Sequence, residues 1–154
     1  ACLLGVNCRY DGGSNDAPAL QPLLQEHHLI PVCAEQLGGL PTPRTPSERR
    51  GDSVIMADGT DVTAEFRAGA EAALYIAEEY GCSAAILKAR SPSCGCGRIY
   101  DGSFSRTLTD GSGVFAELLQ SRGFEVFTEE SWPGLSEDEA AALRPSPSST
   151  GSAS

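Results

Sequence analysis

The sequence predicts an α/β fold: a single domain with a mainly parallel sheet flanked by helices, Rossmann-like in arrangement. Short apolar runs typical of buried strands alternate with longer segments of helical periodicity, a pattern typical of βαβ units. The 154 residues suit one domain. A hydrophobic content of 40% with 21% charged residues is ordinary for a globular protein that buries its own core.

The first part of the chain is expected to run strand, helix, strand and loop. Residues 1–6 read as the end of a strand whose apolar run begins upstream. Residues 17–28 are expected to form a short helix, followed by a strand over residues 29–33, LIPVC. Residues 38–50 are rich in proline and glycine, which predicts a loop.

The middle of the chain contains the longest expected helix. Before it, the Asp58-Gly59 pair within residues 53–62 suits a hairpin turn. Residues 61–80 carry apolar side chains at helical spacing, and Gly81 is a natural stop for that helix. Residues 83–88 then contain an apolar run that predicts another strand.

A last helix and strand complete the predicted domain, which covers residues 1–130. Ser112 can cap a helix that runs to Arg122, and residues 125–128, EVFT, are expected to form a short strand. Residues 131–154 are acidic and then rich in proline and serine. This composition predicts a largely disordered tail.

Charge and composition exclude some classes of function. A formal net charge of -10 argues against general nucleic-acid binding, which needs a basic surface. An anionic small ligand remains possible, because Lys88, the only lysine, lies with Arg90 and Arg98 around a cysteine-rich turn. The sequence has no run of about 18 apolar residues, so no membrane partner is expected. No signal peptide is visible, and a cytoplasmic protein with free thiols is expected.

Three of the six cysteines are expected to meet at one edge of the sheet. Cys33 ends an expected strand, Cys94 follows another, and Cys2 lies early in the first apolar run; ligand sites gather where parallel strands end. Converging thiols fit simple packing, a zinc site, a nucleophilic or redox thiol, or an iron–sulfur cluster. The residue types alone leave these alternatives open.

Three motifs in order resemble those of the DUF523 family, whose characterised members include the thiouracil desulfidases. They are "ACLLGVNCRYDGG" at 1–13, "PVCAEQLGGLPTPR" at 31–44 and "KARSPSCGCGRIYDGSFS" at 88–105, and the likeness runs to about residue 129. The resemblance implies a [4Fe-4S] cluster held by three cysteines, with one open iron. It also implies a non-redox reaction, in which that iron takes the sulfur of a thiolated uracil base, nucleoside or nucleotide and water replaces it.

The family's site residues carry over onto matching positions. The resemblance implies that the cluster ligands are Cys2, Cys33 and Cys94, that Glu35 is the catalytic carboxylate and that Ser91 is the catalytic serine. Ala34 departs from the family's usual proline but removes no functional group. Cys8 and Cys96 fall where relatives carry other residues, so neither is expected to be a ligand.

The residue chemistry agrees with these roles. Glu35 lies two positions after Cys33, so an extended segment would place its carboxylate beside the cluster, where it can act as a base. Ser93 can donate a hydrogen bond to the substrate, and Lys88 and Arg90 are cations for a substrate phosphate. The alternatives are another non-redox [4Fe-4S] lyase or hydratase, and a metal-binding or iron–sulfur module without catalysis. The oligomeric state is left open.

Overall fold

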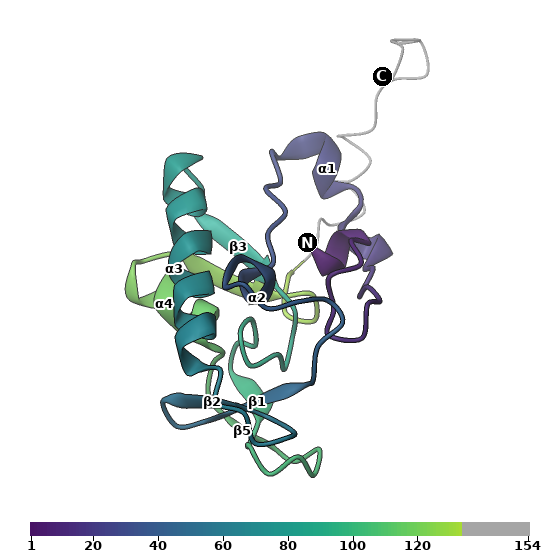
Figure 1. The fold of residues 1–154 in the computed structure, drawn as a ribbon. Helices are drawn as coiled ribbons and strands as arrows, with labels where there is room; N and C mark the ends of the chain where they lie inside the picture. The colour runs from purple at the N-terminus through teal and green to yellow at the C-terminus, as the bar shows by residue number, and fades with distance from the viewer. Residues whose placement is uncertain (134–154) are drawn as a thin grey trace, which may run out of the picture.

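The structure, a computed structural model, describes residues 1–133, and the tail expected over 131–154 lies almost wholly outside them. Helices and short strands are mixed along the chain (Figure 1), which confirms the α/β class. The elements are the 3-10 helices η1 (Cys2–Leu4) and η2 (Pro18–Leu20), the helices α1 (Leu23–Glu26), α2 (Ala34–Leu37), α3 (Thr63–Glu79) and α4 (Val114–Ser121), and the strands β1 (Ser47–Arg50), β2 (Ser53–Met56), β3 (Ala84–Leu87), β4 (Arg98–Tyr100), β5 (Leu108–Asp110) and β6 (Glu125–Thr128).

Within residues 1–133 the strands form three two-stranded sheets instead of one parallel sheet. The pairs β1–β2 and β4–β5 are antiparallel, whereas β3 and β6 pair in parallel with Ala84 opposite Glu125. The parallel arrangement expected from the sequence is therefore found in one strand pair. The Rossmann-like arrangement and the domain boundary at residue 130 stay predictions.

The long helix expected over 61–80 is present as α3. Its buried side chains include Phe66, Ala70 and Ala73, which recur at helical spacing and place one stripe of the helix in the core. The chain leaves the helix through Gly81, whose φ of 67° belongs to the left-handed region that glycine adopts without strain. The helix stop predicted from the sequence is thus confirmed.

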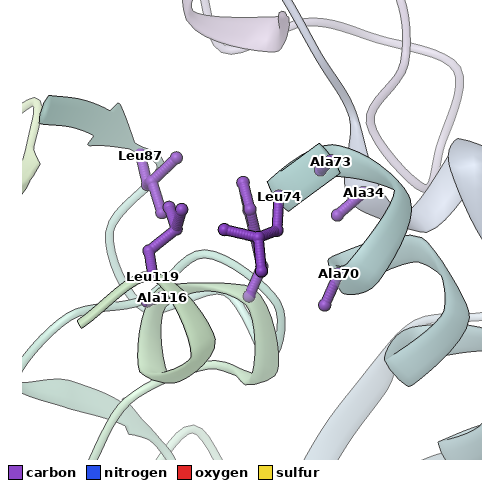
Figure 2. Close-up of a cluster of buried hydrophobic side chains, with 8 residues drawn as sticks. Ala34, Ala70, Ala73, Leu74, Leu87, Ala116 and Leu119 are labelled. Carbon is purple, nitrogen blue, oxygen red and sulfur yellow. The ribbon is translucent and has the colours of Figure 1, made fainter. Parts of the chain in front are cut away.

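Helix α3 packs between α2 and α4 (Figure 2), with Leu74 directed toward the side chains of α4 and Ala70 and Ala73 on the side of α2. The backbones of α2 and α3 come unusually close. A Cβ added at Gly69 would lie 1.8 Å from the carbonyl oxygen of Ala34, so no side chain fits there. This contact holds α2, and with it Cys33 and Glu35, against α3, the longest helix within residues 1–133.

Helix α4 begins at Val114 with Gly113 as its N-cap, and no side chain caps it, so the prediction of a Ser112 cap was wrong. The first N–H groups of α4 instead donate to backbone carbonyls of the cysteine-rich turn. Phe115 N and Ala116 N lie 2.9 and 3.1 Å from Ser93 O. Because these N–H groups have no partner inside the helix, the turn and the helix start satisfy one another.

The N-terminal part of the chain departs most from the sequence expectations. Residues 1–6 form η1 and a turn instead of the end of a strand. Residues 29–33 form no strand. The expected helix over 17–28 is divided into η2 and α1, and Pro22 lies at their junction, where it lacks an N–H to donate.

The loop expected over 38–50 ends earlier than predicted, because its last residues form β1. The turn expected at Asp58-Gly59 is present, and a single bridge between Ile55 and Asp61 closes it. The strands expected over 83–88 and 125–128 are confirmed as β3 and β6. No helix within residues 1–133 combines the length and the apolar character that a bilayer crossing requires.

Candidate functional site

The cysteines predicted to act together come from three separate elements. Cys2 opens η1, Cys33 is the N-cap residue of α2, and Cys94 lies in the turn that follows β3. Burial, and then the neighbouring charges of Glu35, Cys2 and Cys33, raise the pKa of the Cys94 thiol to about 12. These groups are thus close enough to Cys94 to act on its ionisation.

A further thiol joins them. Cys8 is only 2% exposed, and the carbonyl oxygen of Cys8 lies 3.9 Å from Cys33 Sγ. Burial first, and then the neighbouring thiols of Cys33 and Cys2, raise the pKa of Cys8 to about 11. By contrast, Cys96 Sγ accepts a hydrogen bond from Gln120 of α4, at 3.3 Å. The structure therefore brings Cys8, rather than Cys96, to the candidate ligands.

Glu35 is held by an arginine that the sequence analysis did not single out. Arg44 Nε lies 3.1 Å from Glu35 Oε1, and the side chains are 3% and 18% exposed respectively. The same guanidinium donates to Cys8 O at 3.0 Å and to Thr42 Oγ1 at 2.9 Å. Arg44 therefore ties the carboxylate to the loop that carries Cys8. Arg44 is the last residue of the motif at 31–44, and this position was the signal by which the sequence could have identified it.

Cys2 has a neighbour that was also missed. Asn15 Nδ2 donates to Cys2 Sγ at 3.4 Å, and Arg9 donates to Asn15 Oδ1 at 3.3 Å. The arginine bond fixes which end of the Asn15 amide faces the sulfur, because an arginine can only donate. Arg9 is itself held by Asp11 at 2.7 Å. This chain of contacts orients an N–H group toward the sulfur of a candidate ligand.

The turn around Cys94 positions both candidate serines. Ser91 Oγ accepts hydrogen bonds from the N–H groups of Ser93 and Cys94, each at 3.1 Å, which leaves the hydroxyl proton of Ser91 free to be donated. Ser93 is 1% exposed, and its hydroxyl has no hydrogen-bond partner among residues 1–133. A buried hydroxyl without a partner costs stability, so an external acceptor would satisfy it.

The cations expected to bind a substrate phosphate are already paired with carboxylates. Lys88 Nζ lies 2.9 Å from Glu129 Oε1, and Arg90 lies 2.8 Å from Glu130 Oε1. Glu129 also accepts from Ala89 N at 2.8 Å, so this pair joins the ends of the neighbouring strands β3 and β6. The binding role predicted for Lys88 and Arg90 stays a prediction.

The donor set can be compared with the needs of a single metal ion and of a polynuclear cluster. Within residues 1–133 no three Cys, His, Asp or Glu side chains are close enough together to ligate one metal ion. The thiolates of an iron–sulfur cubane bind different irons, so they need not share one ion. The thiols here come from three elements, so each could bind a different iron. The Asn15 amide directed at Cys2 and the unpaired Ser93 hydroxyl are further polar groups that are compatible with such a cluster.

Comparison with known proteins agrees with this geometry. The sequence profile of the 2-thiouracil desulfurase family matches residues 1–131. The chain belongs to the 2-thiouracil desulfurase family. This match spans all three motifs and every candidate ligand, and it confirms the resemblance drawn from the sequence.

Two known proteins are similar to this chain over most of its length. The chain is 40% identical over 139 residues to the uncharacterised protein YbbK of Bacillus subtilis (strain 168), covering 84% of this chain and 92% of YbbK. Its structure is similar to that of the [4Fe-4S]-dependent thiouracil desulfidase TudS, with a TM-score of 0.81 and 45% identity. That similarity covers 92% of this chain and 93% of TudS.

Proposed function

We propose that this protein is a non-redox, [4Fe-4S]-dependent desulfidase that acts on thiolated uracil as a free base, nucleoside or nucleotide. The reaction exchanges C=S for C=O: water supplies the oxygen and two protons, and sulfur leaves as hydrogen sulfide. The observation that carries the proposal is the convergence of Cys2, Cys33 and Glu35 on Cys94. Membership of the 2-thiouracil desulfurase family and the likeness to TudS support it.

In this proposal Cys2, Cys33 and Cys94 hold the cluster. Each comes from a different element, and three protein thiolates would leave one of the four irons without a protein ligand. When bound, the cluster supplies a Lewis acid for the sulfur of the substrate. Cys8 is buried next to Cys33, and we assign it no ligand role.

Glu35 is the proposed base. Water that attacks the carbon of a C=S group must lose protons, and a carboxylate within hydrogen-bond reach can accept one. The bond from Arg44 occupies one oxygen of Glu35 and limits the directions in which the other can point. Ser91 retains a hydroxyl proton for the substrate, since its oxygen already accepts two backbone bonds. Ser93 offers the second hydroxyl.

The cations Lys88 and Arg90 are assigned the secondary role of facing a substrate phosphate. Both are bonded to glutamates, so a phosphate would have to share or displace a carboxylate partner. We therefore expect the free base and the nucleotide to share the contacts with Ser91 and Ser93. The two substrates would differ only in their contacts with these cations.

The experiment is desulfuration by protein reconstituted anaerobically with iron and sulfide. Sulfide release from 2-thiouracil and 4-thiouracil is measured together with iron content. Glu35→Gln should keep its iron and lose activity by about 10²–10⁴-fold, the usual contribution of a positioned acid or base. Glu78→Gln, which changes an exposed carboxylate on α3 whose ion pair with Arg122 spans 3.7 Å, is the matched control.

Three results would contradict the proposal. A wild-type protein that binds four irons and releases no sulfide from any thiolated uracil compound would be an iron–sulfur module without this activity. A Glu35→Gln variant as fast as wild type would remove the proposed base. Zinc in place of iron after anaerobic purification and reconstitution would contradict the cluster itself.

A further inference from the structure

An asparagine side chain is directed at the sulfur of one candidate ligand and has no role in the proposed reaction. Asn15 Nδ2 donates to Cys2 Sγ at 3.4 Å. Within residues 1–133, no side chain donates in this way to the sulfur of Cys33 or of Cys94. The three candidate ligands therefore differ, because only Cys2 has a side-chain N–H group aimed at its sulfur.

The main chain fixes where the Asn15 side chain begins. Asn15 N donates to Cys2 O at 3.1 Å, and two residues later Ala17 N donates to Leu3 O at 2.9 Å. Residues 15–17 are thus bonded to the backbone of η1, and Asn15 is bonded to the same residue whose sulfur its amide reaches. Once the backbone is held, the side chain has only a few staggered positions to choose from.

Arg9 determines which end of the Asn15 amide faces the sulfur. Arg9 Nη1 donates to Asn15 Oδ1 at 3.3 Å and to Ser14 O at 3.0 Å. Because an arginine offers only donors, the amide oxygen must face Arg9 and the amide nitrogen must face Cys2. The guanidinium charge also polarises the amide, which strengthens the hydrogen bond that the amide donates at its other end.

Asp11 and Gly13 hold the guanidinium in this position. Asp11 accepts from Arg9 Nε and Arg9 Nη2, each at 2.7 Å, and this bidentate pair leaves Nη1 for Asn15. The bond from Arg9, and then that from Gly13 N, lower the pKa of Asp11 to about 2, so its carboxylate is charged at neutral pH. A Cβ at Gly13 would lie 2.7 Å from Arg9 Nη2, so a side chain there would displace the guanidinium.

We propose that Asn15 is a positioning residue for the iron–sulfur cluster and that Arg9 acts through it. The inference rests on the proposed function, because it takes Cys2 as a cluster ligand. An N–H group directed at a thiolate ligand withdraws electron density from the sulfur and from the iron that this sulfur binds. The cluster, when bound, is then a better electron acceptor and a stronger Lewis acid toward the sulfur of the substrate.

This role accounts for a part of the motif at 1–13 that supplies no candidate ligand. The pair of Arg9 with Asp11 lies at the surface, where the two side chains are 38% and 42% exposed, whereas the bond from Asn15 to Cys2 is partly buried. Exposed ion pairs contribute little to stability. The pair is therefore better explained by the group that it orients than by the stability that it supplies.

The test is the midpoint potential for one-electron reduction of the reconstituted cluster, compared at equal iron content. Asn15→Leu keeps the size of the side chain and removes the donor. It should shift the reduction equilibrium about tenfold toward the oxidised cluster, which is about 59 mV for one electron, and slow desulfuration by about tenfold. Asn7→Leu, at an exposed asparagine in the same part of the chain, is the matched control and should change neither quantity.

A double-variant cycle tests whether Arg9 acts through Asn15. Gly13→Ala keeps every charge and displaces the guanidinium, so it should shift the potential in the same direction as Asn15→Leu. The protein that carries both changes should show no larger shift than Asn15→Leu alone, because Arg9 has no amide left to orient. Additive shifts, or an unchanged potential in Gly13→Ala, would remove Arg9 from the proposal.

A second measurement uses the wild-type protein with ¹⁵N in the side-chain amides of its asparagines. If Asn15 donates to a ligand of the cluster, pulsed EPR of the reduced cluster should show a weak ¹⁵N coupling. The coupling should be absent in Asn15→Leu and present in Asn7→Leu. This measurement still decides the question if Asn15→Leu fails to retain its iron.

The outcomes separate this inference from the proposed function. Equal potentials in wild type and Asn15→Leu, or a wild-type cluster without the ¹⁵N coupling, would overturn the inference even if sulfide is released from thiouracil. A protein that shows both the coupling and the shift but releases no sulfide would support the inference and overturn the proposed function. A protein that assembles no [4Fe-4S] cluster would overturn both.

Discussion

Arg44 Nε lies 3.1 Å from Glu35 Oε1 in an ion pair whose arginine side chain is 3% exposed. The same arginine donates to Cys8 O, so it links the proposed base to the loop that carries a buried thiol beside Cys33. Because Arg44 is enclosed, its removal leaves Glu35 and the Cys8 carbonyl without this donor. In the proposed mechanism, Arg44 is therefore a positioning residue that acts through Glu35.

Arg44→Gln is expected to lower the free energy of unfolding by about 2–4 kcal/mol, since one partner of a mostly buried pair is removed. Desulfuration should fall by about 10²-fold with the KM for thiouracil nearly unchanged, because the proposed base is misplaced while substrate contacts remain. Arg44→Lys should restore stability better than rate, as a lysine cannot reproduce the guanidinium's several directed bonds. Arg122→Gln, at an exposed pair with Glu78, is the control and should change neither quantity.

The cysteines are expected to divide into ligands and non-ligands when each is changed to Ala and the protein is reconstituted with iron and sulfide. Loss of Cys2, Cys33 or Cys94 should abolish iron retention, because a cluster held by two thiolates is open to solvent. Cys96→Ala and Cys82→Ala should retain wild-type iron, since Cys96 accepts a hydrogen bond from Gln120 and Cys82 lies in the turn between α3 and β3. Iron loss in Cys8→Ala as complete as that in Cys2→Ala would move Cys8 into the ligand set.

Ser91 and Ser93 are expected to respond in opposite directions in cluster-free protein. Ser91→Ala removes an oxygen that accepts two backbone bonds and should cost about 1 kcal/mol. Ser93→Ala removes a buried hydroxyl that has no partner among residues 1–133, so stability should stay equal or rise by about 1 kcal/mol. Urea unfolding of both variants measures this. A Ser93→Ala protein less stable than Ser91→Ala would show that the Ser93 hydroxyl is already satisfied.

The stability of cluster-free protein is expected to fall as the pH rises from about 9 to about 11. The Cys8 thiol has its pKa raised from 9.0 to about 11 by burial and by Cys33 and Cys2. Between these values the unfolded chain has lost this proton and the folded chain keeps it, so rising pH favours unfolding. Cys8→Ala lacks this contribution, so its urea midpoint should fall less over that range. Parallel midpoints for both proteins would contradict the expectation.

Local pattern was enough to predict several elements. The stripe of Phe66, Ala70 and Ala73, with Gly81 behind it, predicted α3 because helix periodicity and stop signals act within a few residues along the chain. The apolar runs at β3 and β6 were recognised for the same reason. The motifs were also enough to nominate Cys2, Cys33, Cys94 and Glu35, because each motif is contiguous in sequence.

The tertiary structure decided which segments pair as strands and which group accepts the hydrogen bonds at the start of α4. Residues 29–33 have the composition of a strand, yet a strand is assigned only where a neighbour completes its ladder, and none does so within residues 1–133. The free N–H groups at the start of α4 donate to Ser93 O instead of to the Ser112 side chain, because the turn around Cys94 packs against the helix.

The candidate site shows the same division. The sequence by itself determined which thiols, carboxylate and hydroxyls the protein carries, and in which motifs they lie. The tertiary structure decided that Arg44 bonds Glu35, that Cys8 is enclosed beside Cys33, and that Lys88 is occupied by Glu129, 41 residues away. The physical reason is that side-chain charges and hydrogen bonds act over a few ångströms of space, and only the folded chain determines which distant residues come that close.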